Sequence, residues 1–392
     1  MAPAAGFSIL RIMLKKLLAH GVLAVALGAG GGLAFLYFRP PAMVPAPNIA
    51  VDRSEARVAR GKYLFSHVSG CIGCHSETDE TRFGGPLTDG VLGKGKKFPL
   101  DAGTPGSLTA PNITADPETG AASWTDGQIL RAMREGIGHD DRVLFPMMPY
   151  DSYAFMSDRD AQAVVAFVRT LPAARNPLPK TKIDFPVNLL IKFAPKPVGS
   201  VAEPNRADPV AYGKYLSNLA GCRFCHTPEK NNAPIAGREF AGGHEFPITP
   251  QARSVSVNLT PDAETGIGKL TEAQFLDKFQ SYKDYAAKGS PKVAPELNTV
   301  MPWLYYSGME PDDLKAIFAY LKTLPAISNA VVSHPDAPEE KAKKSSLNLR
   351  DRRLRAGPAE RLRSRTAATS GLAGGRKKKW SKLGLANAIL EA

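Results

Sequence analysis

Two five-residue motifs with the pattern Cys-x-x-Cys-His are the residues of this chain best suited to chemistry. The first, CIGCH, runs from Cys71 to His75, and the second, CRFCH, runs from Cys222 to His226. This pattern suits three kinds of site: a zinc site, a redox-active dithiol, or a haem attached through two thioether bonds with the histidine as iron ligand.

The spacing and setting of the motifs separate these three possibilities. A zinc ribbon brings together Cys-x-x-Cys pairs some tens of residues apart, whereas Cys71 and Cys222 are 151 positions apart. A dithiol oxidoreductase is expected in a βαβ unit, which the sequence lacks, and it does not need the histidine. A haem uses all five positions, because two thiols on one helical turn add to its vinyl groups while the histidine ligates the iron. The sequence therefore predicts two covalently attached haem c groups, held by Cys71, Cys74, His75, Cys222, Cys225 and His226.

Each motif is followed at a similar distance by a methionine that precedes a proline. Met148 lies 73 residues after the first motif histidine, and Met301 lies 75 residues after the second. A thioether sulfur is a soft ligand that stabilises ferrous iron and raises the reduction potential, which suits electron transfer. Met147 lacks the following proline, and Met156 and Met309 stand just before expected helix starts, so we interpret the last two as packing residues. The predicted iron ligands are His75, Met148, His226 and Met301, and no catalytic residue is expected.

Three sequence blocks occur twice in the same order, which predicts a duplicated domain. The pairs are VARGKYL at 58–64 with VAYGKYL at 210–216, PNITADPETG at 111–120 with VNLTPDAETG at 257–266, and the segments at 148–172 and 301–325 that begin with Met-Pro and end with Leu-Pro.

The elements that must position these residues are predicted to be helices. A Thr-x-x-Gln capping box is expected to open a helix at Thr125 and again at Thr271, and further helices are expected to begin at Ser157 and Glu310. No alternating run indicates a sheet. The expected fold class is all-α, with two tandem domains after an N-terminal transmembrane helix.

The N-terminal region contains one long apolar segment. LLAHGVLAVALGAGGGLAFLYF has no acidic residue, lysine or arginine, and it lies between Lys16 and Arg39. It is long enough to span a bilayer, and it continues into aromatic residues instead of ending at a small-residue cleavage site. We interpret it as an uncleaved anchor in a bacterial cytoplasmic membrane, with the later domains in the periplasm.

Charge is concentrated at the two ends of the chain. Residues 1–40 carry four basic and no acidic residues, and residues 341–392 carry 15 basic and 3 acidic residues, out of a formal net charge of +13. The remainder has a net charge of −3, which argues against a nucleic-acid-binding fold. The expected organisation is a cytoplasmic N-terminus and anchor at 1–40, a proline-rich spacer at 41–54, domains at 55–180 and 207–330 joined by a linker at 181–206, and a disordered basic tail at 331–392.

The recurring blocks resemble the class I cytochrome c superfamily, in the multi-haem branch that includes the cytochrome c subunits of membrane-bound alcohol, aldehyde and gluconate dehydrogenases. The resemblance covers about residues 55–330 and rests on GKYL, GCxxCH, the glycine pairs 84–85 and 242–243, the Asn-Ile/Leu-Thr segments and the Met-Pro sites. It implies that His75 and Met148 ligate the first iron and that His226 and Met301 ligate the second.

The expected function is transfer of single electrons by an electron carrier that is not itself an enzyme. The donor would be a periplasmic or membrane protein such as a dehydrogenase, and the acceptor a terminal oxidase or a soluble cytochrome. The alternative is a di-haem cytochrome c peroxidase-like enzyme, which needs an iron position that can open.

Two further expectations concern residues outside the motifs. The segment FPVNLLIKF in the linker is expected to pack between the two domains. Four histidines are expected to be surface or loop residues: His67, His139, His244 and His334.

Overall fold

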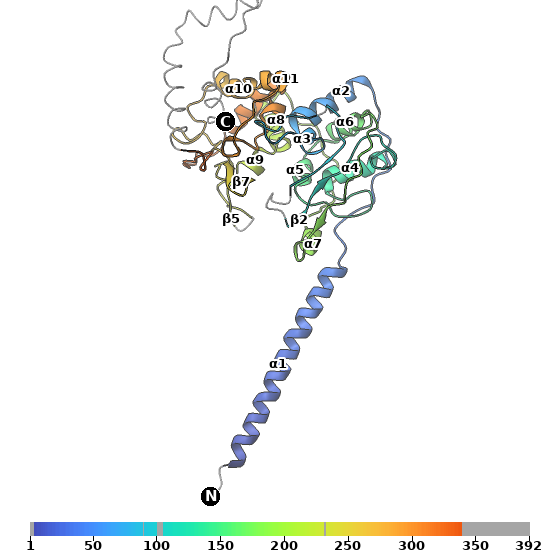
Figure 1. The fold of residues 1–392 in the computed structure, drawn as a ribbon, viewed down its shortest axis with the longest axis vertical. Coiled ribbons are helices and arrows are strands. Elements are labelled where there is room, and N and C mark those ends of the chain that lie inside the picture. Colours follow the sequence, from blue (N-terminus) through green and yellow to red (C-terminus); the bar gives the residue numbers. More distant parts are fainter. Residues whose placement is uncertain (1–3, 89, 100–104, 231–232, 339–392) are drawn as a thin grey trace, which may run out of the picture.

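The computed structural model describes residues 4–88, 90–99, 105–230 and 233–338. A long helix, α1 (Ala4–Phe38), projects from a compact body that holds the other elements (Figure 1). Within it, Met13–Phe38 contains an 18-residue stretch with a mean hydropathy of 1.8 and is long and apolar enough to cross a membrane. The apolar N-terminal helix expected from the sequence is therefore present.

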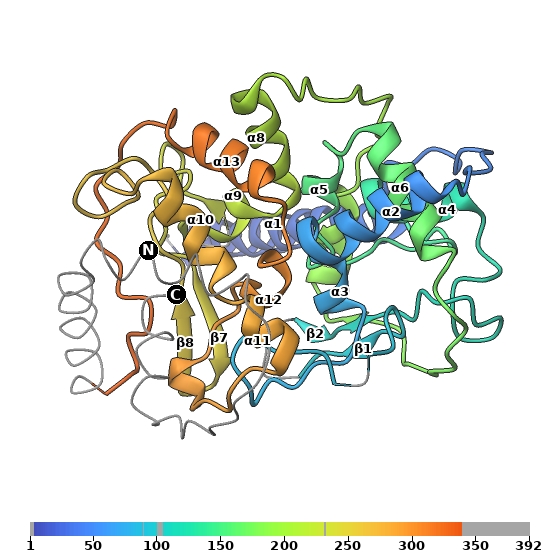
Figure 2. The ribbon, with the colours of Figure 1, turned by 90° about the horizontal axis from the view of Figure 1, so that it is seen from above.

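The body consists of two halves with matching helix order. The first half contains α2 (Glu55–Tyr63), the π-helical turn η1 (Leu64–Val68), α3 (Cys71–Cys74), α4 (Asp126–Glu135), α5 (Tyr150–Tyr153) and α6 (Asp158–Val168). The second half contains α8 (Pro209–Leu219), α9 (Cys222–Cys225), α10 (Glu272–Gln280), α11 (Lys283–Lys288), the 3₁₀ turn η3 (Pro295–Leu297), α12 (Trp303–Tyr306) and α13 (Pro311–Leu321). Figure 2 shows the two groups of helices side by side.

In each half, the first and last helices cross at a glycine. A Cβ atom at Gly61 of α2 would lie 1.8 Å from the Ala163 carbonyl oxygen of α6, and one at Gly213 of α8 would lie 1.8 Å from the Ala316 carbonyl oxygen of α13. The glycine of each GKYL block therefore permits a backbone approach that any larger residue would block.

The predicted helix starts are confirmed. Complete capping boxes form at Thr125 and at Thr271, where the threonine side chain and the Gln side chain three residues later each accept a backbone N–H. Ser157 caps α6, and Glu310 precedes α13 with a proline in its first turn. These signals depend on neighbouring residues, so the sequence alone carries them.

The expectation of an all-α fold holds only in part. The described residues also form four two-stranded antiparallel sheets, all of them short. Their pairs are β1 (Lys96–Lys97) with β3 (Thr109–Ala110), β2 (Gly106–Ser107) with β4 (Lys182–Ile183), β5 (Glu229–Lys230) with β6 (Ala233–Pro234), and β7 (Glu245–Thr249) with β8 (Ala252–Val255). The register of the longest pair shifts between Pro247 and Thr249, so no regular polar–apolar alternation marked it in the sequence.

One hydrophobic core runs through both halves. It joins side chains of the α2–α6 region to side chains of α8, α10, α12 and α13. At the junction the ring of Phe83 stacks on Tyr282 with centroids 5.4 Å apart. The backbone N–H of Gly84 donates to Asn298 Oδ1 at 3.0 Å, and Asn298 Nδ2 donates to the Glu80 carbonyl at 3.0 Å. The two halves therefore form one packed body.

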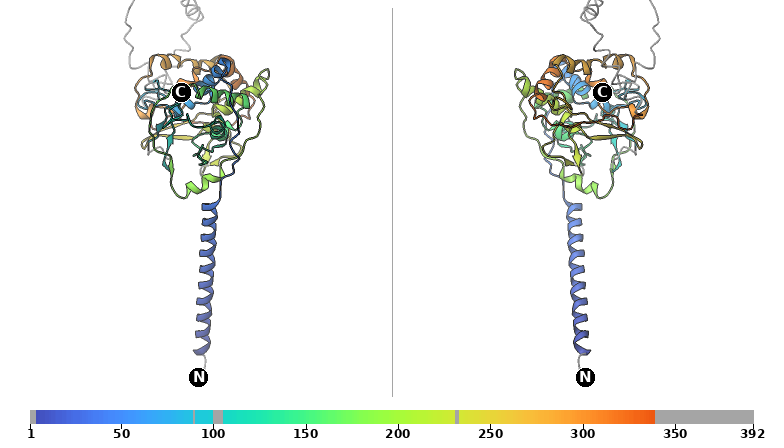
Figure 3. Two further views of the ribbon diagram at one scale, coloured as in Figure 1. Left: turned by 90° about the vertical axis from the view of Figure 1, so that its right-hand side faces the viewer. Right: turned by 90° about the vertical axis from the view of Figure 1, so that its left-hand side faces the viewer.

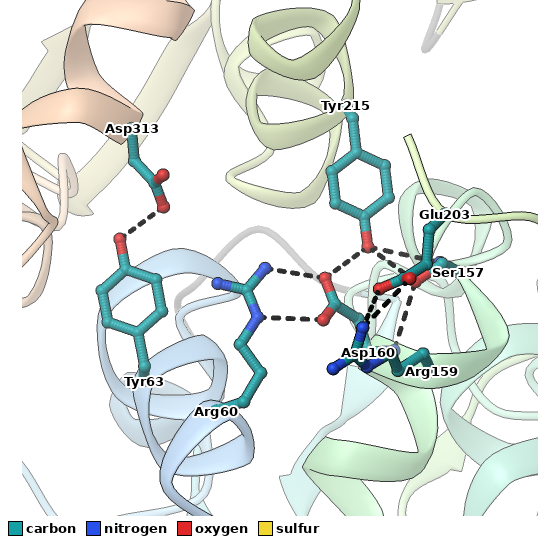
Figure 4. Close-up of polar contacts among 8 residues, drawn as sticks. All are labelled: Arg60, Tyr63, Ser157, Arg159, Asp160, Glu203, Tyr215 and Asp313. Carbon is teal, nitrogen blue, oxygen red and sulfur yellow. Dashed lines mark hydrogen bonds and ion pairs between the residues drawn. The ribbon is translucent and has the colours of Figure 1, made fainter. Parts of the chain in front are cut away.

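A polar cluster crosses the same junction (Figure 4). Arg60 donates two hydrogen bonds to the carboxylate of Asp160, at 2.9 and 2.8 Å, and the Tyr215 hydroxyl of the second half donates to the same carboxylate at 2.8 Å. The Tyr63 hydroxyl donates to Asp313 Oδ2 at 2.7 Å. Each half thus supplies a tyrosine that binds an aspartate of the other.

The linker lies elsewhere than expected. Its apolar part forms α7 (Val187–Leu190) and the 3₁₀ turn η2 (Ile191–Phe193). The expectation that it packs between the halves is wrong, because Lys192 Nζ donates to the Tyr37 carbonyl at the end of α1, at 2.7 Å. Pairing of β4 with β2 directs the chain toward this end of the first half.

The segment after α13 is partly held to the body. The N–H of Val255 in β8 donates to the Ser333 carbonyl at 2.8 Å, and Arg253 forms an ion pair with Asp336 at 3.4 Å. Of the tail expected at 331–392, this first part is therefore attached to β8. The predicted disorder of the rest falls on residues 339–392, which lie outside the described residues.

Candidate haem attachment sites

The cysteines of each motif lie on a single helical turn. Gly70 precedes α3 with a φ of 64°, and Gly221 precedes α9 with a φ of 65°. This left-handed conformation favours glycine, and it turns the chain sharply into the helix. None of the four cysteines is in a disulfide, so both pairs suit the same reaction.

Both motif histidines are buried and oriented in the same way. His75 Nδ1 lies 2.9 Å from the Pro111 carbonyl oxygen, and His226 Nδ1 lies 2.8 Å from the Val257 carbonyl oxygen. A carbonyl only accepts hydrogen bonds, so Nδ1 carries the proton and Nε2 keeps a lone pair for a metal. Burial lowers the pKa of His75, and it lowers the pKa of His226 to about 4. Both rings are therefore neutral at pH 7.

A buried asparagine fixes the carbonyl that orients His75. Asn112 Oδ1 accepts from the N–H of Thr114 at 3.0 Å and from its hydroxyl at 2.7 Å. Asn112 Nδ2 donates to Thr119 Oγ1 at 3.0 Å and to the Ala174 carbonyl at 2.7 Å. All four hydrogen bonds hold the loop that presents the carbonyl of the preceding residue, Pro111.

The second half repeats this network. Asn258 Oδ1 accepts from the N–H and the hydroxyl of Thr260 at 2.9 and 2.8 Å, and Nδ2 donates to Thr265 Oγ1 at 3.0 Å and to the Ile327 carbonyl at 2.7 Å. The residue before Asn258 is Val257, whose carbonyl binds His226. The sequence showed that the Asn-x-Thr segment recurs, but it did not reveal this positioning role.

The glycine that corresponds to Gly242 in the first half is Gly95, and not a member of the pair 84–85 that the sequence indicated. The N–H groups of Gly95 and Gly242 donate to the carbonyls of the two motif histidines, at 2.8 and 2.7 Å. A Cβ at either glycine would lie 2.7 Å or less from backbone atoms of the Asn-x-Thr loop. Gly84 and Gly85, taken as the counterparts of 242–243, instead contact the second half. The repeated letters GG were therefore a misleading signal.

The two motifs lie near each other in the shared core. The Tyr306 hydroxyl donates to the Ala220 carbonyl just before the second motif, at 2.6 Å, and the Tyr153 hydroxyl donates to the corresponding carbonyl before the first. The Tyr305 ring packs against the first motif so closely that a Cβ at Gly73 would lie 2.8 Å from its Cε2 atom. The dipeptide 305–306 therefore contacts both motifs.

The predicted methionine ligands lie on the wall of this core. Met148 and Met301 are partly buried against it, as are Cys71 and Cys222. Each methionine carbonyl accepts the N–H of the residue two positions later, at 2.8 and 2.7 Å, so both stand at the same place before a short helix. The pairing of each methionine with its histidine stays a prediction. The other methionines behave as interpreted: Met156 and Met309 are buried packing residues, and Met147 is exposed.

Two buried donors mark where a polar group of a ligand would fit. The Tyr150 hydroxyl and the Trp303 Nε1 have no hydrogen-bond partner within the described residues, and each stands two positions after a predicted methionine ligand. An unpartnered buried donor is costly unless a bound group satisfies it. The carboxylates of a haem suit such donors. The residues present therefore fit two covalently bound haems.

The chemistry of the thiols fits the other two possibilities less well. Burial raises the pKa of Cys71, Cys222 and Cys225 to about 12, whereas a redox-active dithiol needs a thiolate. No group of three or more His, Cys, Asp or Glu side chains arranged to hold a metal ion occurs in the described part of the chain.

The remaining histidines divide into two groups. His139 and His244 stack on neighbouring aromatic rings. His67 is not a surface residue, because it is half-buried at the junction, where its Nδ1 lies 2.9 Å from the Tyr305 carbonyl oxygen. His334 is also buried. His334 nevertheless lies in a loop, as expected. The expectation of a surface or loop position was wrong for His67, which lies in η1, because tertiary contacts decide its burial.

Comparison with known proteins agrees with this geometry. The family model described as Cytochrome c matches residues 58–172. A protein of Cereibacter sphaeroides named "Diheme cytochrome c-type" is 30% identical over 281 residues, which cover 69% of this chain and 86% of that protein. The cytochrome c subunit of the quinone-dependent alcohol dehydrogenase of Gluconobacter oxydans is 29% identical over 292 residues, covering 71% of this chain.

The dehydrogenase subunits are longer than the region they share with this chain. The match spans 57% of the Gluconobacter oxydans subunit and 60% of the gluconate 2-dehydrogenase cytochrome c subunit of Pantoea cypripedii, which is 29% identical. The di-haem relative is covered almost throughout. From the two oriented motif histidines and these similarities, the chain belongs to the cytochrome c family.

Proposed function

We propose that this chain is a membrane-anchored di-haem cytochrome c that passes single electrons between a dehydrogenase and a terminal oxidase or soluble cytochrome. The observation that carries the proposal is the repeated histidine geometry, in which Nδ1 is bound to a backbone carbonyl at both motifs, so that Nε2 keeps its lone pair. A bound haem c would supply reversible one-electron chemistry at its iron.

The chain's own residues have three tasks in this function. The cysteines would hold the haem covalently, and the buried histidines and the methionines would ligate its iron. A methionine ligand and an apolar surrounding favour the ferrous form and raise the potential. The carbonyls beside Asn112 and Asn258 keep the histidine rings in a fixed tautomer, which limits reorganisation when an electron arrives.

We further propose that the two halves are tandem class I cytochrome c domains that arose by internal duplication. Support comes from the matched glycine crossings, capping boxes, asparagine networks and tyrosine-to-carbonyl hydrogen bonds. The family model covers only the first half, so the second is assigned by this likeness.

The proposed location is the periplasmic side of the bacterial cytoplasmic membrane. The apolar part of α1 supports an anchor, and basic residues precede its apolar core, which favours a cytoplasmic N-terminus. The names of the relatives support a dehydrogenase as electron donor. The acceptor is proposed by its chemistry alone, as a protein that takes one electron at a time.

The experiment is to purify the full chain from membranes and measure covalent haem per chain and the spin state of each iron. We expect two haems, both low-spin, with reversible one-electron reduction and no peroxide turnover. The matched variants Cys71→Ala/Cys74→Ala and Cys222→Ala/Cys225→Ala should each keep one haem. A chain with no covalent haem would refute the proposal, and a high-spin haem with peroxide turnover would favour the peroxidase instead.

A further inference from the structure

We propose that the segment 185–193, here called the shelf, is a second membrane-contact site. Its exposed apolar side chains would enter the boundary between headgroups and acyl chains of the bilayer that α1 crosses. This inference rests on the proposed anchoring by α1, and its occupant is the phospholipid surface.

The shelf is held firmly on the first half. Strand β4, just before it, pairs with β2, and the Asp184 N–H donates to the Pro105 carbonyl at 2.9 Å. Within the shelf, Leu189 is buried, and after the shelf the Val198 N–H donates to Glu135 Oε1 at 3.2 Å. The shelf therefore has a fixed position on the body.

The same segment touches the end of the apolar helix. Lys192 Nζ donates to the Tyr37 carbonyl, and the Arg39 guanidinium lies 4.3 Å from the ring centroid of Phe193. Figure 1 shows α7 at the end of the body from which α1 projects, and Figure 3 shows the same arrangement from two other sides. Where α1 leaves the bilayer, the shelf lies at the level of the interface.

The side chains of the shelf suit that level. Phe185 is 67% exposed, Leu190 52% and Phe193 44%, which is unusual for large apolar residues close together in a protein body. Lys192 lies between Leu190 and Phe193, and Lys196 follows them; lysines beside apolar residues favour anionic lipid headgroups. Segments of this composition bury about 5–10 Å into the boundary region.

Continuity with α1 favours lipid over protein as the occupant. Tyr37 and Phe38 are exposed at the end of the span, and the shelf extends this apolar surface sideways. Two contacts fix the orientation of a body on a membrane, whereas the helix and the spacer alone would let it tilt.

The test uses the full haem-containing chain in vesicles of phosphatidylcholine and phosphatidylglycerol. A spin label is attached in turn at Leu190→Cys, at Val25→Cys within α1, and at Val332→Cys, an exposed apolar position on the segment after α13. Collision with oxygen, which concentrates in lipid, is compared with collision with a water-soluble nickel complex. We expect the labels at 25 and 190 to favour oxygen severalfold over the label at 332.

The outcomes separate the two proposals. If the label at 25 favours oxygen while the label at 190 favours nickel, the shelf proposal is overturned and the anchor stands. If both favour nickel, the anchor itself fails. Protection of the label at 190 from both reagents means that a protein surface covers it, which also overturns the proposal. Phe185→Ser with Phe193→Ser should return the label at 190 to water; an unchanged label would contradict insertion through these rings.

Discussion

Replacing Asn258 by alanine removes four hydrogen bonds from the loop that orients His226. The side chain is 3% exposed, so water does not readily replace them. The Ile327 carbonyl keeps a hydrogen bond from Thr260 Oγ1 at 3.2 Å, which leaves the Thr260 N–H as the group without a partner. At about 1 kcal/mol for each net hydrogen bond, less this compensation, we expect a loss of about 3 kcal/mol in the free energy of unfolding.

The same change should alter one haem more than the other. Once its loop loosens, the Val257 carbonyl no longer fixes the Nδ1 proton of His226, so the potential of the second haem should shift. The assay combines denaturant unfolding with a redox titration that resolves both haems. Asn112→Ala is the matched control, with the same loss of stability and a shift at the first haem instead.

Two results would refute this reasoning. One is a loss of stability below about 1 kcal/mol, which would mean that the network contributes no more than a single hydrogen bond. The other is an equal shift of both potentials by each variant, which would mean that the asparagines act through the whole body and not through their own histidines.

Three further changes test other parts of the structure. Met148→Ala and Met301→Ala should each abolish the methionine-to-iron absorption band of one haem and lower its potential while covalent attachment survives; unchanged redox titrations would contradict the ligand assignment. Gly213→Ala should lower the free energy of unfolding by about 3 kcal/mol in a denaturant titration, because the new methyl group would force α8 from α13; a variant as stable as the native chain would disprove that close crossing. Burial opposes the charged form of Asp160, but the interaction with Arg60 outweighs burial and keeps the pKa of this carboxyl low. The resulting stabilisation is present at pH values above the unfolded-state pKa of about 4, and it is lost as the pH falls through the pKa of the folded state. Asp160→Asn should flatten that acid slope in unfolding measurements, and an unchanged slope would locate the effect elsewhere.

The local parts of the fold could be predicted because their signals are local. The capping boxes at Thr125 and Thr271, the starts at Ser157 and Glu310, and the long apolar helix depend on residues within one or two turns. The packing role of Met156 followed from its place before a helix start, and the structure buries it completely.

The parts that were missed depend on contacts between distant residues. Gly95 carries no signal that it contacts the histidine loop, because the contact forms across a turn of irregular length. His67 is half-buried at the junction, where its Nδ1 lies against the carbonyl oxygen of Tyr305, a residue far away in the sequence. The shelf was expected to pack between the two halves, but it lies at the end of α1. Apolar composition indicates that a segment contacts another apolar surface, but it does not indicate which one.

The contact of one dipeptide with both motifs has a kinetic consequence. In proteins whose redox domains move on a flexible linker, electron transfer must wait until the two domains meet by diffusion. The rate of electron transfer therefore falls as the solvent becomes more viscous. Here the Tyr305 ring packs on the first motif while the Tyr306 hydroxyl donates to the carbonyl of Ala220, two residues before the second motif, inside a single core. In the proposed function, electron exchange between the two haem sites needs no domain search, so we expect its rate to be independent of solvent viscosity.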